Sequence, residues 1–180
     1  MIKGAIKDNK RRYQLWRIWN KDQPLLLYIL LNPSYADANA DDRTVLKLIN
    51  FTKKFGYGGF YLGNLHSYVT PYPKILKDKI LADDTTNVKH LNRMKKKCKK
   101  VVFAWGNDGH LPKWLIEMVE SPMCFRRNKN GSPKHPLYLS HKTNLIPFDC
   151  YFKNLPKTQE SYSTANWQSL KVKGRFSKKK

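Results

Sequence analysis

A short, continuous apolar run restricts the folds that this chain can adopt. Residues 25–31 read LLLYILL and are followed at once by Asn32-Pro33-Ser34. The run is short for a helix, and it lacks the polar alternation of a strand with one solvated face. It therefore predicts a strand covered on both faces, as in a parallel sheet between helices.

The sequence after this run alternates between helix and strand patterns. A helix is expected over residues 44–55, because Asp41 and Asp42 suit the positive end of a helix and Gly56 suits its end. Residues 13–19 alternate imperfectly, which suits a strand near a sheet edge. Strands are also expected at 60–62, 101–105 and 123–125, with possible extension at 137–139, and helices at 85–100 and 111–120. These elements predict a three-layer α/β/α sandwich with a mostly parallel sheet of about four strands and an N-terminal edge strand.

The chain is strongly basic. It has 35 Lys and Arg against 13 Asp and Glu, a formal net charge of +22. An excess of this size attracts polyphosphate, so nucleic acid is the expected partner, with DNA favoured. The phosphate-binding candidates are Lys96, Lys97, Arg126, Arg127, Lys129 and Lys134, for which a solvated surface is the alternative interpretation. A single domain is expected over residues 1–165, followed by a basic, flexible tail over 166–180.

Cofactors and membranes are not expected from this sequence. Cys98, Cys124 and Cys150 lie far apart and lack the paired spacing of a zinc site. No apolar stretch is long enough to cross a bilayer, and residues 1–12 are polar. We therefore expect a cytoplasmic monomer that uses no metal or cofactor.

Polar residues follow three of the expected strands. They are Asn32, then Asn64 with His66, then Trp105 with Asn107 and Asp108. Ligands of open α/β sheets bind at the carboxyl ends of the strands, so these side chains are expected to converge. For Asn32, an Asx-turn before Pro33 remains an alternative.

Four motifs resemble the uracil-DNA-glycosylase superfamily in their order and spacing. They are Asn32-Pro33-Ser34, Gly63-Asn64, the segment 101–106 (VVFAWG) and the segment 135–140 (HPLYLS). The chain also resembles a group of bacterial and phage domains catalogued only as a domain of unknown function, over about residues 12–139. The marks of that group include LNPSYADANADD at 31–42, GYGG at 56–59 and GSPKHPLYL at 131–139.

The glycosylase resemblance implies an enzyme that hydrolyses the N-glycosidic bond of a flipped, modified base and leaves an abasic site, in DNA repair or in defence against phage DNA. It implies that Asn32 orients the attacking water, that Asn64 reads the base edge and that His135 stabilises charge on the departing base. Leu139 falls at the position of an intercalating leucine. Such chemistry needs a held water and a hydrogen-bonding group at the base, because the transition state resembles an oxocarbenium ion.

Further residues complete the expected site. An Asn32 amide cannot accept a proton, so a carboxylate of the same loop is needed, and Asp37 is the preferred candidate. Asp41 or Asp42 is expected to cap the following helix. Tyr35 is the preferred aromatic to stack on a flipped base, and the remaining base-binding candidates are His66, Asp42 and Trp105.

Two other functions fit the same residues. Asp37, Asp41, Asp42 and His66 would suit a Mg²⁺-dependent nuclease. A non-catalytic module could instead use the basic surface to coat nucleic acid.

Overall fold

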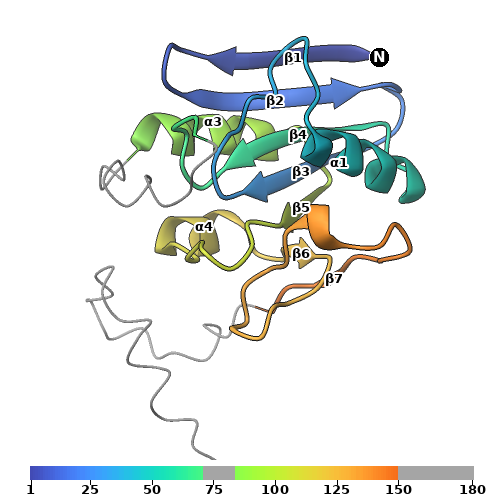
Figure 1. Ribbon diagram of the computed structural model, residues 1–180, viewed down its shortest axis with the longest axis vertical. Helices are drawn as coiled ribbons and strands as arrows, with labels where there is room; N and C mark the ends of the chain where they lie inside the picture. The colour runs from blue at the N-terminus through green and yellow to red at the C-terminus, as the bar shows by residue number, and fades with distance from the viewer. Residues whose placement is uncertain (71–83, 150–180) are drawn as a thin grey trace, which may run out of the picture. The chain divides into compact units, whose positions relative to one another are not determined.

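A computed structural model of the chain describes residues 1–70 and 84–149, and within them the sheet is mixed and seven-stranded (Figure 1). Its spatial order is β1-β2-β4-β3-β5-β6-β7. The strands are β1 (Ile2–Lys7), β2 (Arg12–Ile18), β3 (Leu25–Leu30), β4 (Gly59–Asn64), β5 (Lys100–Phe103), β6 (Met123–Cys124) and β7 (Ile146–Pro147). The helices are α1 (Arg43–Lys54), α3 (Thr85–Lys95) and α4 (Lys113–Met118), with a short 3₁₀ helix, η2 (Pro136–Tyr138).

The α/β class is confirmed, whereas the expected number of strands is wrong. The four central strands, β4, β3, β5 and β6, are mutually parallel, as a buried apolar run at 25–31 requires. Antiparallel strands extend this unit on both sides, with β1 and β2 at one end and β7 at the other. The sequence pattern did not predict β1 because most of its residues, IKGAIK, are exposed, and it did not predict β7 because only two residues pair there.

Residues 13–19 do form most of a strand, but that strand is not at the edge. β2 pairs with β1 on one side and with β4 on the other, so β1 is the N-terminal edge strand. Gly4 of β1 lets Trp16 lie across it, because a Cβ at Gly4 would come within 2.0 Å of the Trp16 ring.

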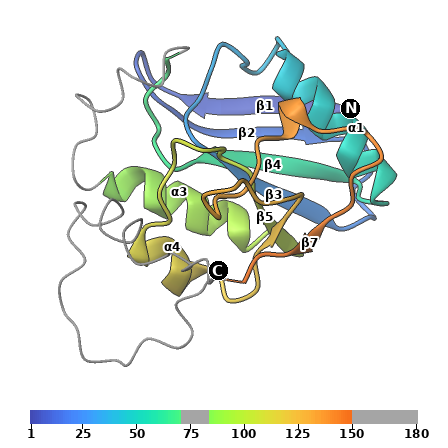
Figure 2. The same cartoon turned by 60° about the horizontal axis from the view of Figure 1, so that its bottom comes forward.

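Helices cover both faces of the sheet (Figure 2). On one face, Val45, Leu48 and Phe51 of α1 join a core with Phe60 and Leu62 of β4. On the other face, α3 packs against Gly63, whose absent side chain makes room for Leu91 and Met94. The sheet therefore lies between α1 and α3.

The capping residues place α1 as expected. Asp42 is its N-cap and accepts a hydrogen bond from the Val45 N–H at 2.8 Å. The helix ends at Lys54 with Phe55 as the C-cap, and Gly56 then takes a φ of 74°, which favours glycine.

Several other boundaries differ from the predictions. The helix expected at 85–100 ends at Lys95, and the one expected at 111–120 covers only Lys113–Met118. Residues 137–139 do not extend: Pro136 starts η2, where its fixed φ suits the first helical turn. The strand expected at 101–105 is Lys100–Phe103, and the one expected at 123–125 ends at Cys124.

The described residues, 1–70 and 84–149, form one compact unit. The expected tail over residues 166–180 and the end of the expected domain at residue 165 lie outside the described residues. No helix in the described part of the chain is long and apolar enough to cross a membrane.

Candidate active site

A polar pocket of about 150 Å³ lies at the carboxyl ends of β3 and β4. It is lined by the first residue of β2, the loop after β3, the first turn of α1 and the residue before η2. η2 packs against α1, which brings the late segment 135–138 to this edge (Figure 1). The lining residues are Arg12, Leu30, Asn32, Ser34, Asp42, Thr44, Val45, Leu62, Thr70 and His135.

Asn32 is held in one orientation in this pocket. Its Nδ2 donates to the carbonyl of Pro33 at 3.0 Å and to the carbonyl of Thr70 at 2.6 Å. Both contacts are to acceptors, so they assign the amide nitrogen and leave Oδ1 as the acceptor. An acceptor fixed in this way can hold a water molecule.

His135 lines the same pocket. Its Nδ1 accepts a hydrogen bond from the Leu137 N–H at 3.3 Å, so the neutral ring carries its proton on Nε2. Burial lowers the pKa of His135, and the charge of Asp42 opposes this shift only in part. His135 is therefore a neutral donor at pH 7.

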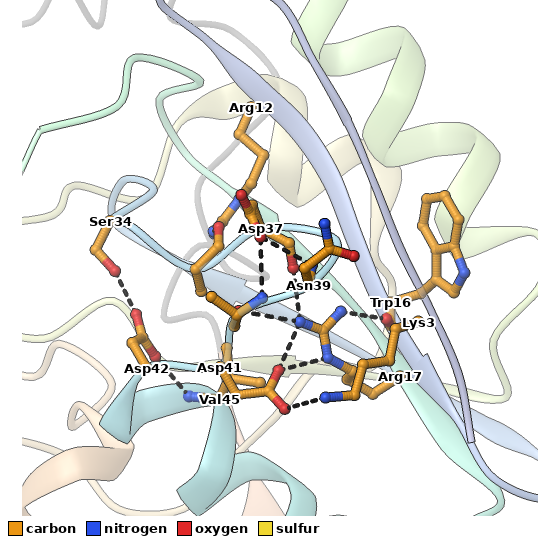
Figure 3. A network of polar contacts seen from close by, with 12 residues as sticks. Lys3, Arg12, Trp16, Arg17, Ser34, Asp37, Asn39, Asp41, Asp42 and Val45 are labelled. Carbon is orange, nitrogen blue, oxygen red and sulfur yellow. Dashed lines mark hydrogen bonds and ion pairs between the residues drawn. The ribbon is translucent and has the colours of Figure 1, made fainter.

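Asp42 is the carboxylate of the pocket. Its Oδ1 accepts the Val45 N–H, and its Oδ2 accepts a short hydrogen bond from the Ser34 hydroxyl (Figure 3). A carboxylate has about four acceptor positions, so one side of each oxygen remains for a further partner.

Arg12 was not among the predicted site residues. Strand alternation from Leu15 would place it on the opposite face of the sheet, but the register of β2 against β1 shifts between Ile6 and Lys7. This β-bulge adds one residue to β2 and turns Arg12 toward the pocket. A charged residue at the start of a buried strand was the only signal in the sequence.

Asp37 lies outside the pocket, contrary to the role predicted for it. Its Oδ1 accepts the backbone N–H groups of Asn39 and Ala40, and its Oδ2 lies 3.5 Å from the Lys7 ammonium. These two backbone hydrogen bonds lower the pKa of Asp37. The Asp37 carboxylate therefore stabilises the turn of its own loop and does not join Asn32 in the pocket.

Asp41 also lies outside the pocket lining, and its carboxylate is paired with two cations (Figure 3). It accepts from Arg17 Nε at 2.6 Å and from Lys3 Nζ at 2.8 Å. Burial raises the pKa of Asp41, but the hydrogen bonds from Lys3 and Arg17 outweigh burial and hold it below its usual value.

The predicted base-binding residues divide between the two faces of the sheet. Asn64 pairs in register with Leu30, so it lies at the same edge as Asn32, and it shares the face of Leu62. It is 1% exposed, and its Nδ2 has no partner in the described structure. Trp105 instead packs against Phe103 and away from the pocket.

His66 does not line the pocket either. Burial lowers the pKa of His66, the charge of Asp84 opposes this shift and that of His110 adds to it. Of the residues predicted to converge, Asn32 therefore lines the pocket and Asn64 lies at the same edge, while His66 and Trp105 are not part of the lining; His135 and Asp42, candidates from other segments, do line it.

The surface near His135 differs from the prediction in one side chain. Leu139 is 6% exposed and belongs to the core, so it cannot enter a base stack in this conformation. Tyr138 is 76% exposed, and its ring centroid lies 5.9 Å from that of His135. Tyr35, in the loop after β3, is 74% exposed.

The basic candidates lie at two different edges of the sheet. Lys134 and Arg126 belong to a hairpin that leads directly into His135, and Lys129 lies exposed at its turn. Arg127, in the same hairpin, pairs with Asp149 at 3.8 Å. Lys96 and Lys97 follow α3 at the amino ends of the parallel strands, where the Lys99 N–H donates to Leu25, and this edge is opposite the pocket.

The geometry does not support the magnesium cluster of the alternative nuclease function. Among residues 1–70 and 84–149, no group of three or more His, Cys, Asp or Glu side chains is arranged to hold a metal ion. Asp37 and Asp41 are paired with cations, and His66 is not among the residues that line the pocket with Asp42.

Together the fold and the pocket define an α/β protein with a polar site at the carboxyl edge of its parallel strands. The chain belongs to the family described as "Protein of unknown function (DUF1643)", whose model matches residues 12–137. This range contains every residue that lines the pocket. No curated protein and no solved structure gave a match to the chain.

Proposed function

We propose that this chain is a DNA glycosylase that hydrolyses the N-glycosidic bond of a flipped base. The observation that carries the proposal is the presence of Asn32, Asp42 and His135 in one pocket, although they come from separate segments of the chain. They supply an amide acceptor, a carboxylate and a neutral imidazole donor.

Each of these groups can act at one step of the proposed reaction. Asn32 Oδ1 holds a water molecule, and Asp42 takes a proton from it as it attacks the sugar carbon. The bond between that carbon and the base nitrogen breaks, and the electron pair leaves with the base. His135 Nε2–H donates a hydrogen bond to the departing base and stabilises its negative charge.

The size of the pocket favours a single-ring base. A volume of about 150 Å³ equals that of an engineered protein cavity that binds benzene. A pyrimidine has a ring of the same size, whereas a purine has a second ring. We therefore favour a modified pyrimidine.

The surroundings of the pocket suit a nucleic acid. Tyr138 is exposed beside His135 and offers an aromatic face on which a neighbouring base can stack. Arg126 and Lys129 are exposed on the adjoining hairpin and suit phosphate contacts. Tyr138 replaces Leu139 in this proposal as the residue that enters the stack.

The test is mass spectrometry for free bases released from a panel of genomic DNAs that includes phage DNA with modified pyrimidines. Asp42→Asn should reduce the release rate about a hundredfold or more, because general-base catalysis is lost. Asn remains a good N-cap, so α1 should persist. Asp37→Asn is the matched control and should retain activity, because its carboxylate lies outside the pocket.

Other outcomes would replace this proposal. Equal activity of Asp42→Asn and Asp37→Asn would remove Asp42 from the mechanism. Direct strand breaks that EDTA abolishes would identify a nuclease. DNA binding that survives Asn32→Ala and His135→Ala, with no base released by the unmodified chain, would identify a binding module.

A further inference from the structure

Arg12 is a buried cation in the pocket wall that lacks a carboxylate partner. Its side chain is 4% exposed, and one guanidinium N–H donates to the Ala36 carbonyl. Its Nε has no hydrogen-bond partner. No ion pair joins Arg12 to a carboxylate in the described ranges 1–70 and 84–149.

Arg17, on the same strand, shows what a satisfied buried arginine requires. It is 0% exposed, and its donors reach Asp41 and the carbonyls of Trp16, Asp37 and Ala40 (Figure 3). Arg12 has the same environment without the carboxylate. A buried guanidinium N–H without an acceptor lowers the stability of the folded protein, so its presence in the pocket wall calls for an explanation.

The charge of Arg12 is present at neutral pH. Burial lowers its pKa to about 10, opposed by the nearby charges of Asp42 and Asp37, and that value is still well above 7. Asp42 does not pair with the guanidinium: in the described residues its oxygens accept from the Val45 N–H and the Ser34 hydroxyl, and no ion pair joins it to Arg12.

We propose that Arg12 binds an oxyanion of the substrate, a phosphate or carboxylate group, inside the pocket. A guanidinium whose Nε–H has no acceptor can donate a charge-assisted hydrogen bond to an oxygen of either group. The identity of the carrier rests on the proposed function: in a flipped nucleotide, the oxyanion is the phosphate of that nucleotide or a carboxylate substituent of its base.

Calorimetric titration of the full chain tests this with five probes: inorganic phosphate, thymidine, thymidine monophosphate, uracil and carboxyuracil. A phosphate subsite requires tighter binding of thymidine monophosphate than of thymidine. A carboxylate subsite requires tighter binding of carboxyuracil than of uracil. In either case, Arg12→Met should weaken the preferred anion about tenfold or more, since charge-assisted hydrogen bonds are lost.

Two variants serve as controls. Arg126→Met removes the same charge from an exposed position outside the pocket and should leave probe binding unchanged. Arg12→Lys keeps the charge without the planar fork and should lose less affinity than Arg12→Met. Because Arg12→Lys retains a cation at the site, its probe affinities still test the proposal if Arg12→Met does not fold.

The results separate this inference from the proposed function. Anion binding that is absent, or that Arg12→Met and Arg126→Met weaken equally, would overturn the Arg12 site. Anion binding that depends on Arg12, together with no base release from any DNA, would uphold the site and refute only the glycosylase.

Discussion

Replacing each of the two buried arginines of β2 by methionine should have very different effects on stability. Arg17→Met removes one partner of Asp41 and the hydrogen bonds that Arg17 donates to the carbonyls of Trp16, Asp37 and Ala40, of which Ala40 keeps the Asp37 N–H as a donor. Breaking a buried ion pair by removing one partner costs about 3–5 kcal/mol. Asp41 keeps Lys3, so we expect a loss near the lower end, about 3 kcal/mol.

Arg12→Met should cost much less. The variant loses one hydrogen bond, to the Ala36 carbonyl, worth about 1 kcal/mol, and it removes a buried charge that has no carboxylate partner. We expect a change in the free energy of unfolding within about 1 kcal/mol of zero, of either sign. Methionine fills a similar volume in both variants, so the comparison isolates polar contacts.

Urea unfolding followed by circular dichroism measures both values under one condition. The midpoint should fall clearly for Arg17→Met and shift little for Arg12→Met, with the slope unchanged. Equal losses would refute the argument, because they would show that Arg12 is as fully satisfied as Arg17.

Two further predictions concern pH and salt. Because burial lowers the pKa of His135, the unfolded chain binds a proton there at higher pH than the folded chain, so the free energy of unfolding should rise as the pH increases toward about 7. His135→Gln should flatten that rise in urea titrations, and an unchanged profile would show that His135 is not shifted. Alanine at both Arg126 and Lys129 should reduce the slope of log affinity against log salt by about 2 for a short DNA, if each contacts one phosphate. Alanine at Lys96 and Lys97, at the opposite edge of the sheet, should leave the slope unchanged, and the reverse result would place the DNA at that edge.

Local sequence was sufficient to predict the centre of the fold. The run at 25–31 could only be a buried strand, and it became β3 with its neighbours parallel. Asp42 and Gly56 gave both ends of α1, because capping and positive φ are properties of a few adjacent residues. The order of strands and helices then placed Asn32 and Asn64 at one edge.

The hydrophobic pattern of the sequence did not predict the outer strands, β1 and β7. β1 exposes most of its side chains, and Trp16 of β2 covers its glycine. β7 consists of two residues whose pairing with β6 depends on the whole preceding chain. Neither strand has a periodicity long enough to be recognised.

The candidate site, like the fold, was predicted only in part from the sequence. The sequence by itself determined that Asn32, Asp42 and His135 carry groups able to act at a strand edge. Only the tertiary structure decided which carboxylate shares the pocket with Asn32: the ion pairs of Asp37 and Asp41 with Lys7, Arg17 and Lys3 draw those two away. The tertiary structure also decided that Arg12 faces the pocket. A β-bulge changes the face of the sheet on which a side chain lies, and the bulge depends on the register between two strands rather than on the residues of either strand.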